Sequence, residues 1–180
     1  NNLTFSGFGK IKIDKDFEEI DYFIEKKENK ISFNTNLNLE STKFQIDNIN
    51  FKKKDKSKLK LLIDAELKIN KNLIINNFII NEENNNITIK NLSLNDDNRI
   101  IKIDQANFNY RDTENKKNIY NIKKVKGQNY LIDGTSFNAN FLISNLLDAD
   151  NKKENNLFEN NVSMYITFKE VYFDKIYFVK

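Results

Sequence analysis

The chain contains no cysteine, no histidine, no proline and no tryptophan, and only four of its 180 residues are glycine. Without cysteine and histidine it can form no disulfide bond, no zinc site of the Cys/His type, no cysteine nucleophile, no Ser–His pair and no histidine base. We therefore expect neither an enzyme nor a cofactor. The lack of cysteine is compatible with both the cytoplasm and the periplasm.

Strong charge and long apolar runs are missing as well. The 29 basic and 26 acidic residues leave a net charge of +3, which does not favour nucleic acid as a partner. No apolar stretch reaches the roughly 18 residues that a membrane-spanning helix needs, and no signal peptide is recognisable. Apolar residues nevertheless make up 39% of the chain and aromatic residues 12%, which suffices for one domain with a hydrophobic core.

The most prominent feature that is present is a repeated apolar spacing, h-x-h-x-x-h-x-h, in which h is apolar. Its five copies are Phe44, Ile46, Ile49 and Phe51; Leu73, Ile75, Phe78 and Ile80; Ile87, Ile89, Leu92 and Leu94; Ile101, Ile103, Ala106 and Phe108; and Ile166, Phe168, Val171 and Phe173. The fourth copy continues at Tyr110, and the fifth at Ile176 and Phe178. On a helix, at about 100° per residue, these positions would scatter over both sides. On a strand, one extra residue forms a β-bulge that returns the second half to the same face and curves the sheet.

Segments outside these copies also predict strands. Residues 3–13, 20–24, 31–39 and 59–69 contain apolar side chains at alternate positions, and polar turns separate them. Short connections between successive strands favour an antiparallel meander.

One segment instead has helical spacing, at Phe137, Phe141, Leu142 and Leu146. It predicts a short helix over about residues 137–147, with Thr135 or Ser136 as N-cap. Nine or ten strands make a sheet about 45 Å wide, whereas this helix is about 16 Å long. The helix cannot cover the apolar face, so either the sheet curls onto itself or something else apolar occupies it. We predict an all-β fold, a curved antiparallel meander whose regular bulges form an apolar groove.

Charged clusters are the other candidates for chemistry. Asp96–Asp97 and Glu82–Glu83 are possible metal ligands or acid/base pairs, but solvated turns are the preferred interpretation. The acids between Asp14 and Glu19 lack the glycine and spacing of a calcium loop. The run KKKDKSK at 52–58 is a possible contact for phosphate or anionic lipid, although a charged turn beside an exposed edge is preferred.

Several stretches resemble the AsmA-like proteins, especially those of the YhdP and TamB type. They include SGFGKIKID, ISFNTNLNLE, LIINNFII and ITIKNLSL, and the closest is YLIDGTSFNANFLISNLL at 130–147. The last resembles that family's strand, glycine, Ser-Phe-Asp-Ala and short apolar helix, with Asn138 where Asp is usual. The resemblance implies a long protein of the Gram-negative periplasm, anchored in the inner membrane, whose curved sheet carries phospholipid towards the outer membrane. The family has no catalytic residues.

Pattern and resemblance together predict that residues 1–180 are a single segment of a longer lipid-transfer protein. Its partners would be phospholipid acyl chains and an inner-membrane anchor outside this chain. The groove would be lined by the residues of the five copies from Phe44 to Phe168, without the small Ala106. The alternative is a structural or adhesive surface β-sandwich that binds no ligand.

Overall fold

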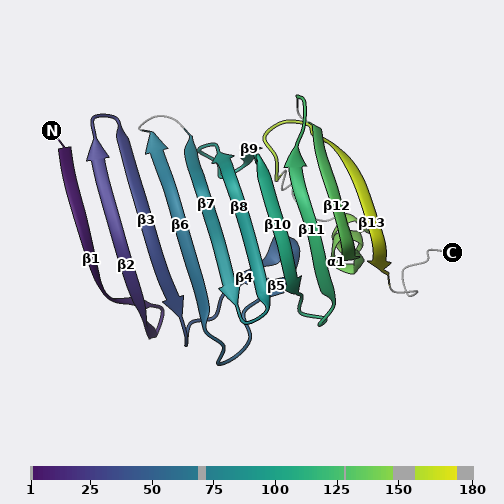
Figure 1. Cartoon of the computed structure of the whole chain (residues 1–180), viewed down its shortest axis with the longest axis horizontal. Helices are drawn as coiled ribbons and strands as arrows, with labels where there is room; N and C mark the ends of the chain where they lie inside the picture. The colour runs from purple at the N-terminus through teal and green to yellow at the C-terminus, as the bar shows by residue number, and fades with distance from the viewer. Residues whose placement is uncertain (1, 69–71, 128, 148–156, 174–180) are drawn as a thin grey trace.

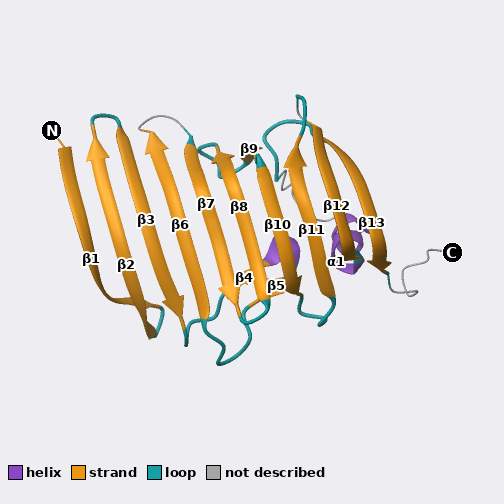
Figure 2. Ribbon diagram, in the orientation of Figure 1, coloured by secondary structure: helices purple, strands orange, loops and turns teal. Residues whose placement is uncertain are grey.

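A computed structural model describes residues 2–68, 72–127, 129–147 and 157–173, and most of them belong to one curved sheet (Figure 1). The strands of this sheet are β1 (Asn2–Ile13), β2 (Asp16–Lys27), β3 (Lys30–Leu39), β6 (Leu59–Lys68), β7 (Leu73–Glu82), β8 (Asn85–Leu94), β9 (Ile100–Lys102), β10 (Gln105–Arg111), β11 (Lys117–Lys124), β12 (Asn129–Asn138) and β13 (Ser163–Tyr172). The smaller elements are β4 (Gln45–Ile46), η1 (Asp47–Ile49), β5 (Phe51–Lys52) and α1 (Asn140–Leu147). Strands dominate the described residues (Figure 2), so the predicted all-β class is confirmed.

The sheet follows the chain from β1 to β13, with β9 beside β8 and the β4–β5 hairpin outside it. Neighbouring strands are antiparallel, as predicted, except for the last pair, because β13 runs parallel to β12. A parallel pair needs a crossover rather than a tight turn, and the chain enters this crossover through α1. The prediction of a purely antiparallel meander is therefore wrong at this edge.

One face of the sheet is apolar across its whole width. Directly paired residues share a face, so the register can be followed from strand to strand. One row of successive partners crosses ten strands and contains only apolar residues and glycine: Gly9, Ile20, Leu37, Leu61, Ile80, Ile87, Phe108, Tyr120, Gly134 and Phe168. The prediction of a continuous apolar face is thus confirmed.

The predicted bulges occur in the second and third copies of the repeat. On β7 the register with β6 shifts beside Asn76, and the β7–β8 pairing omits both Asn76 and Asn91. Asn91 has a φ of 50°, in the left-handed region that extra bulge residues often occupy. On β8, Ile89 pairs with Phe78 and Leu92 with Ile75, so both halves of each strand keep their apolar residues on one face.

The fifth copy is bulged as well. The register of β11 with β12 shifts beside Thr135, and the β12–β13 pairing omits Thr135 and Lys169. Phe168 pairs with Gly134, and Val171 with Phe137, so the apolar residues before and after the bulge stay on the core side. Ile176 and Phe178 lie outside the described residues.

The first and fourth copies differ from the prediction. Phe44 to Phe51 is not one bulged strand but the β4–η1–β5 hairpin, in which Ile46 pairs with Phe51 and Asn50 turns the chain with a φ of 52°. In the fourth copy the register with β8 shifts at Ile101, and the strand ends before Ile103. Ile100 rather than Ile101 therefore packs against the core.

The helix starts later than predicted. β12 extends through Asn138 because β13 pairs with it there, so Phe137 lies in a strand and α1 begins at Asn140. The Oδ1 atom of Asn138 accepts the backbone N–H of Asn140 at 3.1 Å, so it acts near the helix start instead of Thr135 or Ser136. Leu146 lies in α1, but its side chain is outside the described ones.

Candidate apolar binding site

Among the residues that the structure describes, two segments cover the middle of the apolar face. The first, residues 40–58, includes the β4–β5 hairpin and is named the covering segment below; in Figure 1 the hairpin lies behind the sheet. The second is the stretch 157–162, in which Phe158 and Val162 pack against the core, and Phe158 lies 5.6 Å from the Tyr130 ring. The two ends of the face extend beyond both segments.

Glu18 holds the start of the covering segment. It lies on β2 on the same face as Ile20 and is only 2% exposed. Its carboxylate accepts the backbone N–H groups of Glu40, Ser41 and Thr42 at 2.8, 2.9 and 2.5 Å. Burial by itself raises the pKa of Glu18, but these hydrogen bonds outweigh burial and hold the pKa below its ordinary value.

Glu82 holds the other end of the covering segment. It is fully buried, and its carboxylate accepts the Lys54 backbone N–H at 2.7 Å, the Ser57 hydroxyl and the Asn85 amide. The expected solvated turn is therefore wrong for Glu82, although Glu83 is exposed and forms an ion pair with Lys54.

Of the other charged clusters predicted from the sequence, one lies where it was expected and one does not. Asp96 and Asp97 are exposed in a turn, as predicted. The run at 52–58 is not a turn beside an exposed edge, because it belongs to the covering segment, and its Lys53 and Ser57 are buried.

An apolar cavity of about 420 Å³ lies between the hairpin, α1 and the last strands of the sheet. Ile49 and Asn50 bound it on the hairpin side, while Phe141 and Leu142 bound it on the helix side. Its remaining apolar lining comes from the sheet and the start of α1: Tyr110, Tyr120, Ile122, Ile132, Phe137, Ala139, Ile143, Met164, Ile166, Phe168 and Val171. The volume lies within the range of about 300–1,000 Å³ that is usual for small-molecule sites.

Aromatic rings stand in one wall of this cavity, at Tyr120 and Phe168, and directly behind it, at Phe108. Phe108 stacks on Tyr120 at 4.5 Å between centroids, and Tyr120 meets Phe168 edge-on at 6.0 Å. Gly134 lies between the last two, and a Cβ there would stand 2.6 Å from the Cβ of Tyr120 and 2.8 Å from the Phe168 ring. Any side chain at Gly134 would separate these rings, so the glycine is required for the close approach.

A polar network, buried except at the exposed Glu114, closes one end of the cavity. Asp112 accepts the amides of Asn118 and Asn138 at 3.0 and 2.8 Å, and Glu114 accepts those of Asn138 and Asn140 at 2.9 and 3.1 Å. An aspartate in place of Asn138 would face two carboxylates. The amide at this position is therefore explained by its neighbours.

The hydroxyls in the cavity wall are protonated at ordinary pH. Burial raises the pKa of Tyr120 to about 12, and burial raises that of Tyr110 further. The Tyr110 hydroxyl donates to the carbonyl of Ile49 at 2.7 Å, which fixes the hairpin tip to β10. The Tyr110 and Tyr120 side chains therefore contribute neutral, largely apolar surface to the cavity wall.

The predicted groove residues fall into four groups. Three line the cavity: Ile49, Ile166 and Phe168. Five are almost completely covered by protein: Phe51, Ile80, Ile87, Ile103 and Phe108. Five more pack partly against the same core: Phe44, Ile46, Phe78, Ile89 and Leu92. Four are half-buried outside that core: Leu73, Ile75, Leu94 and Ile101.

Sequence reasoning missed most of the cavity lining. Tyr120, Ile122 and Ile132 come from β11 and β12, where the alternation before Thr135 is regular and lacks the bulge spacing. Simple alternation over 119–123 and 130–133 would have assigned them to the same face. Phe137 was placed in the helix instead.

No protein-family model, no curated protein and no solved structure matches this chain. Within the residues that the structure describes, no helix has the length and apolar character needed to cross a membrane. Among the same residues, no three acidic side chains come close enough together to hold a metal ion.

Proposed function

We propose that this chain is a lipid-binding segment of a bridge-like transfer protein of the AsmA-like type, and that its apolar face holds phospholipid acyl chains. The observation that carries the proposal is the cavity of about 420 Å³, whose lining is almost wholly apolar and includes half-exposed side chains on β13. Ile166 and Val171 are 57% and 52% exposed there. Apolar side chains open to solvent beside an apolar cavity favour an apolar ligand.

The other end of the face supports the same reading. A second row of paired residues on the same face runs through Phe5, Ile24, Phe33, Ala65, Ile75 and Leu92. Phe5 is 54% exposed and Leu67, on the same face, 40%. Each CH₂ group that leaves water here contributes about 0.8 kcal/mol.

The proposed mechanism is passive. Acyl chains lie along the apolar face, head groups remain at its rim, and similar neighbouring positions let a lipid slide without a large change in free energy. On this proposal the parent protein lies in the periplasm, is anchored to the inner membrane through a segment outside this chain, and carries phospholipid between the two membranes. The chain acts without catalysis or a cofactor.

A structural or adhesive domain without ligand is the second candidate. The middle of the face favours it, because Phe51, Ile80 and Ile87 are buried as in an ordinary core. The two candidates differ in what they predict for β13 and the cavity.

The test is lipid retention by the chain purified without detergent. Ile166→Asp puts a charge into the cavity wall, while Tyr165→Asp puts the same charge on the opposite face at a similarly exposed position, 63% against 57%. Mass spectrometry of extracted lipid should find phospholipid in the wild type and in Tyr165→Asp. Ile166→Asp should retain about ten-fold less, since a cost of about 1.4 kcal/mol already changes occupancy ten-fold.

Thermal unfolding of both variants shows whether each is folded. Phospholipid no more abundant than in a control protein of similar size would favour the structural domain. Equal retention by the two variants would mean that lipid binds somewhere other than the cavity.

A further inference from the structure

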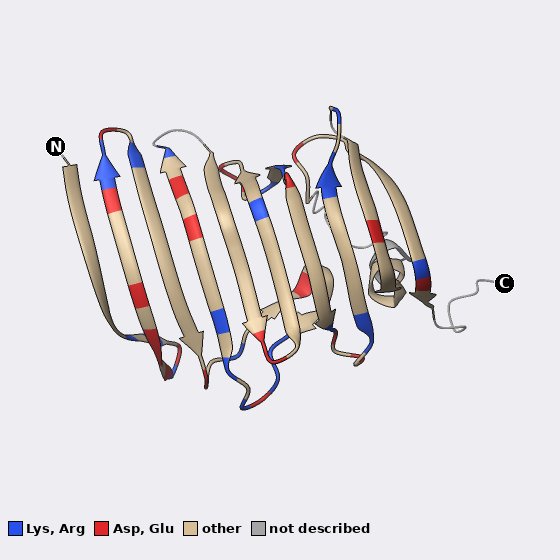
Figure 3. Cartoon of the chain, in the orientation of Figure 1, with Lys and Arg blue, Asp and Glu red and all other residues tan. Residues whose placement is uncertain are grey.

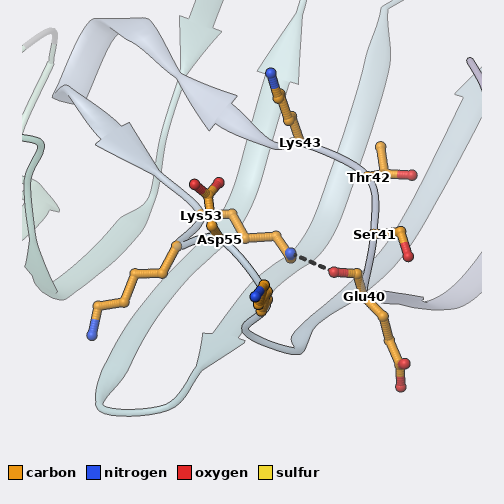
Figure 4. Close-up of a pocket in the computed structure, with 8 residues that line it drawn as sticks. Glu40, Ser41, Thr42, Lys43, Lys53 and Asp55 are labelled. Carbon is orange, nitrogen blue, oxygen red and sulfur yellow. Dashed lines mark hydrogen bonds between the residues drawn. The ribbon is translucent and has the colours of Figure 1, made fainter.

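A second cavity, of about 420 Å³, lies at the base of the covering segment (Figure 4). Its walls are the two strands of backbone that enter and leave the hairpin, residues 40–43 and 53–56. The backbone N–H of Lys53 donates to the carbonyl of Phe44 at 2.8 Å, which ties these walls together. Glu18 fixes the first wall by accepting three of its N–H groups. The pocket is therefore built on backbone that is held in place.

Lys53 is the central side chain of this pocket. It is only 6% exposed, and its Nζ donates to the carbonyl of Glu40 at 2.8 Å. Figure 4 shows the side chain reaching across the pocket to this carbonyl. Throughout the described ranges, no carboxylate oxygen lies within 4.0 Å of Lys53. A buried ammonium group is costly unless an anion and further acceptors are near it.

The surrounding charges also favour an anion. The lining contains four lysines and two carboxylates, so its formal charge is 4 − 2 = +2. One of these carboxylates, that of Glu40, forms an ion pair with Lys58 at 2.5 Å. Lys54 is paired with Glu83, whereas Lys43 and Lys56 take part in none of the ion pairs found in the described part of the chain. Asp55 is the remaining acid, and it is exposed.

We propose that this pocket binds a phosphate group, with the Lys53 ammonium as its central contact and Lys43 and Lys56 at the rim. Lysine is a common point-charge ligand for phosphate, and a phosphate would supply Lys53 with the negative charge and acceptors that it lacks. The phosphate belongs either to a lipid head group or to a free anion. This site shares no lining residue with the apolar cavity, so it stands independently of acyl-chain binding.

The experiment titrates inorganic phosphate into the purified chain at constant ionic strength, with binding followed by calorimetry. Lys53→Met removes the buried charge and keeps an unbranched side chain that is shorter by one heavy atom. Lys60→Met is the matched control, because Lys60 is exposed and alternates with the inward-facing Leu59 and Leu61. Saturable binding should occur in the wild type and the control and be at least about ten-fold weaker in Lys53→Met, which corresponds to about 1.4 kcal/mol. Equal affinities in the two variants, or no saturable binding to the wild type, would overturn the site.

Thermal unfolding checks that Lys53→Met is folded, and the exposed Lys43→Gln provides a second variant that does not disturb the core. If Lys53→Met is unfolded, weaker phosphate binding by Lys43→Gln supports the site and unchanged binding contradicts it.

A second titration uses dihexanoyl phosphatidic acid below its micelle concentration. Tighter binding of this lipid than of inorganic phosphate, sensitive to Lys53→Met, assigns the site to a head group, whereas equal affinity assigns it to a free anion. If Ile166→Asp binds this lipid no more tightly than inorganic phosphate, that result concerns the apolar cavity and not the phosphate site.

Discussion

At the scale of single residues, the two inward-facing glutamates decide how the apolar face is covered. Glu18 and Glu82 lie on the face of the sheet that otherwise carries Leu and Ile, where an unpaired carboxylate would be strongly unfavourable. Each is satisfied by backbone or side-chain donors of the covering segment. They therefore specify where the segment docks, and the loss of either should release one end of it.

Glu18→Gln should lower the free energy of unfolding by about 1–3 kcal/mol at pH 7, because its amide NH₂ cannot accept one of the backbone N–H groups. The pKa of Glu18 is held below its ordinary 4.5 in the folded state. Its stabilising effect is therefore complete above pH 4.5 and is lost as the pH falls through the lowered pKa. Urea unfolding should show a smaller difference in the free energy of unfolding between wild type and Glu18→Gln at about pH 3 than at pH 7. The exposed Glu19→Gln should show little effect at either pH, and a gap for Glu18→Gln that stays constant with pH would contradict the assignment.

At the scale of the strands, the repeat h-x-h-x-x-h-x-h is the same in both directions. When two antiparallel strands carry it and a two-residue turn joins them, their extra residues come to lie opposite each other. Asn76 and Asn91 meet in this way between β7 and β8. The interruption between β9 and β10, at Asp104, continues the same line of bulges, because Lys90 on β8 pairs with Gln105 on β10. A line of bulges across neighbouring strands bends the sheet as a whole.

Deletion of Asn91 tests the bulge. Without this residue the copy becomes a regular alternation, so Ile87, Ile89, Leu92 and Leu94 stay on one face, and the chain also loses a residue with positive φ. We expect urea unfolding to show that the deletion of Asn91 lowers the free energy of unfolding by less than about 2 kcal/mol. Deletion of Thr88, in the regular half of β8, shifts the fully buried Ile87 to the other face and should cost at least about 3 kcal/mol. Similar losses for the two deletions would mean that Asn91 is an ordinary strand position.

Periodicity predicted the strands, their common apolar face and the bulges on β7, β8 and β13. It failed at Phe44–Phe51, because a hairpin whose two arms carry apolar residues has the same spacing as a bulged strand. It also failed at the helix start, where pairing with β13 keeps residues up to Asn138 extended. The cavity itself was not predictable, because it depends on how α1 and the hairpin tip approach the sheet. The anchoring role of Glu18 gave no local signal, since its partners lie more than twenty residues away.

At the scale of the whole molecule, the sheet has more apolar surface than the described residues of the chain cover. The covering segment and the stretch 157–162 protect the middle, and β1 and β13 leave apolar side chains exposed at the two edges. Charged residues lie along the strands and in the loops at both ends of the sheet (Figure 3). The proposed function uses this arrangement, with apolar chains along one face and water on the other.

Photo-crosslinking with a phospholipid that carries a diazirine in its acyl chain tests this account most directly. After irradiation and proteolysis, mass spectrometry should place the adducts on peptides from both sides of the apolar cavity, namely residues 137–143 and 164–171. Excess unlabelled phospholipid should compete with them. Adducts absent from these peptides, or spread equally over strand residues of the polar face, would contradict acyl-chain binding in the cavity.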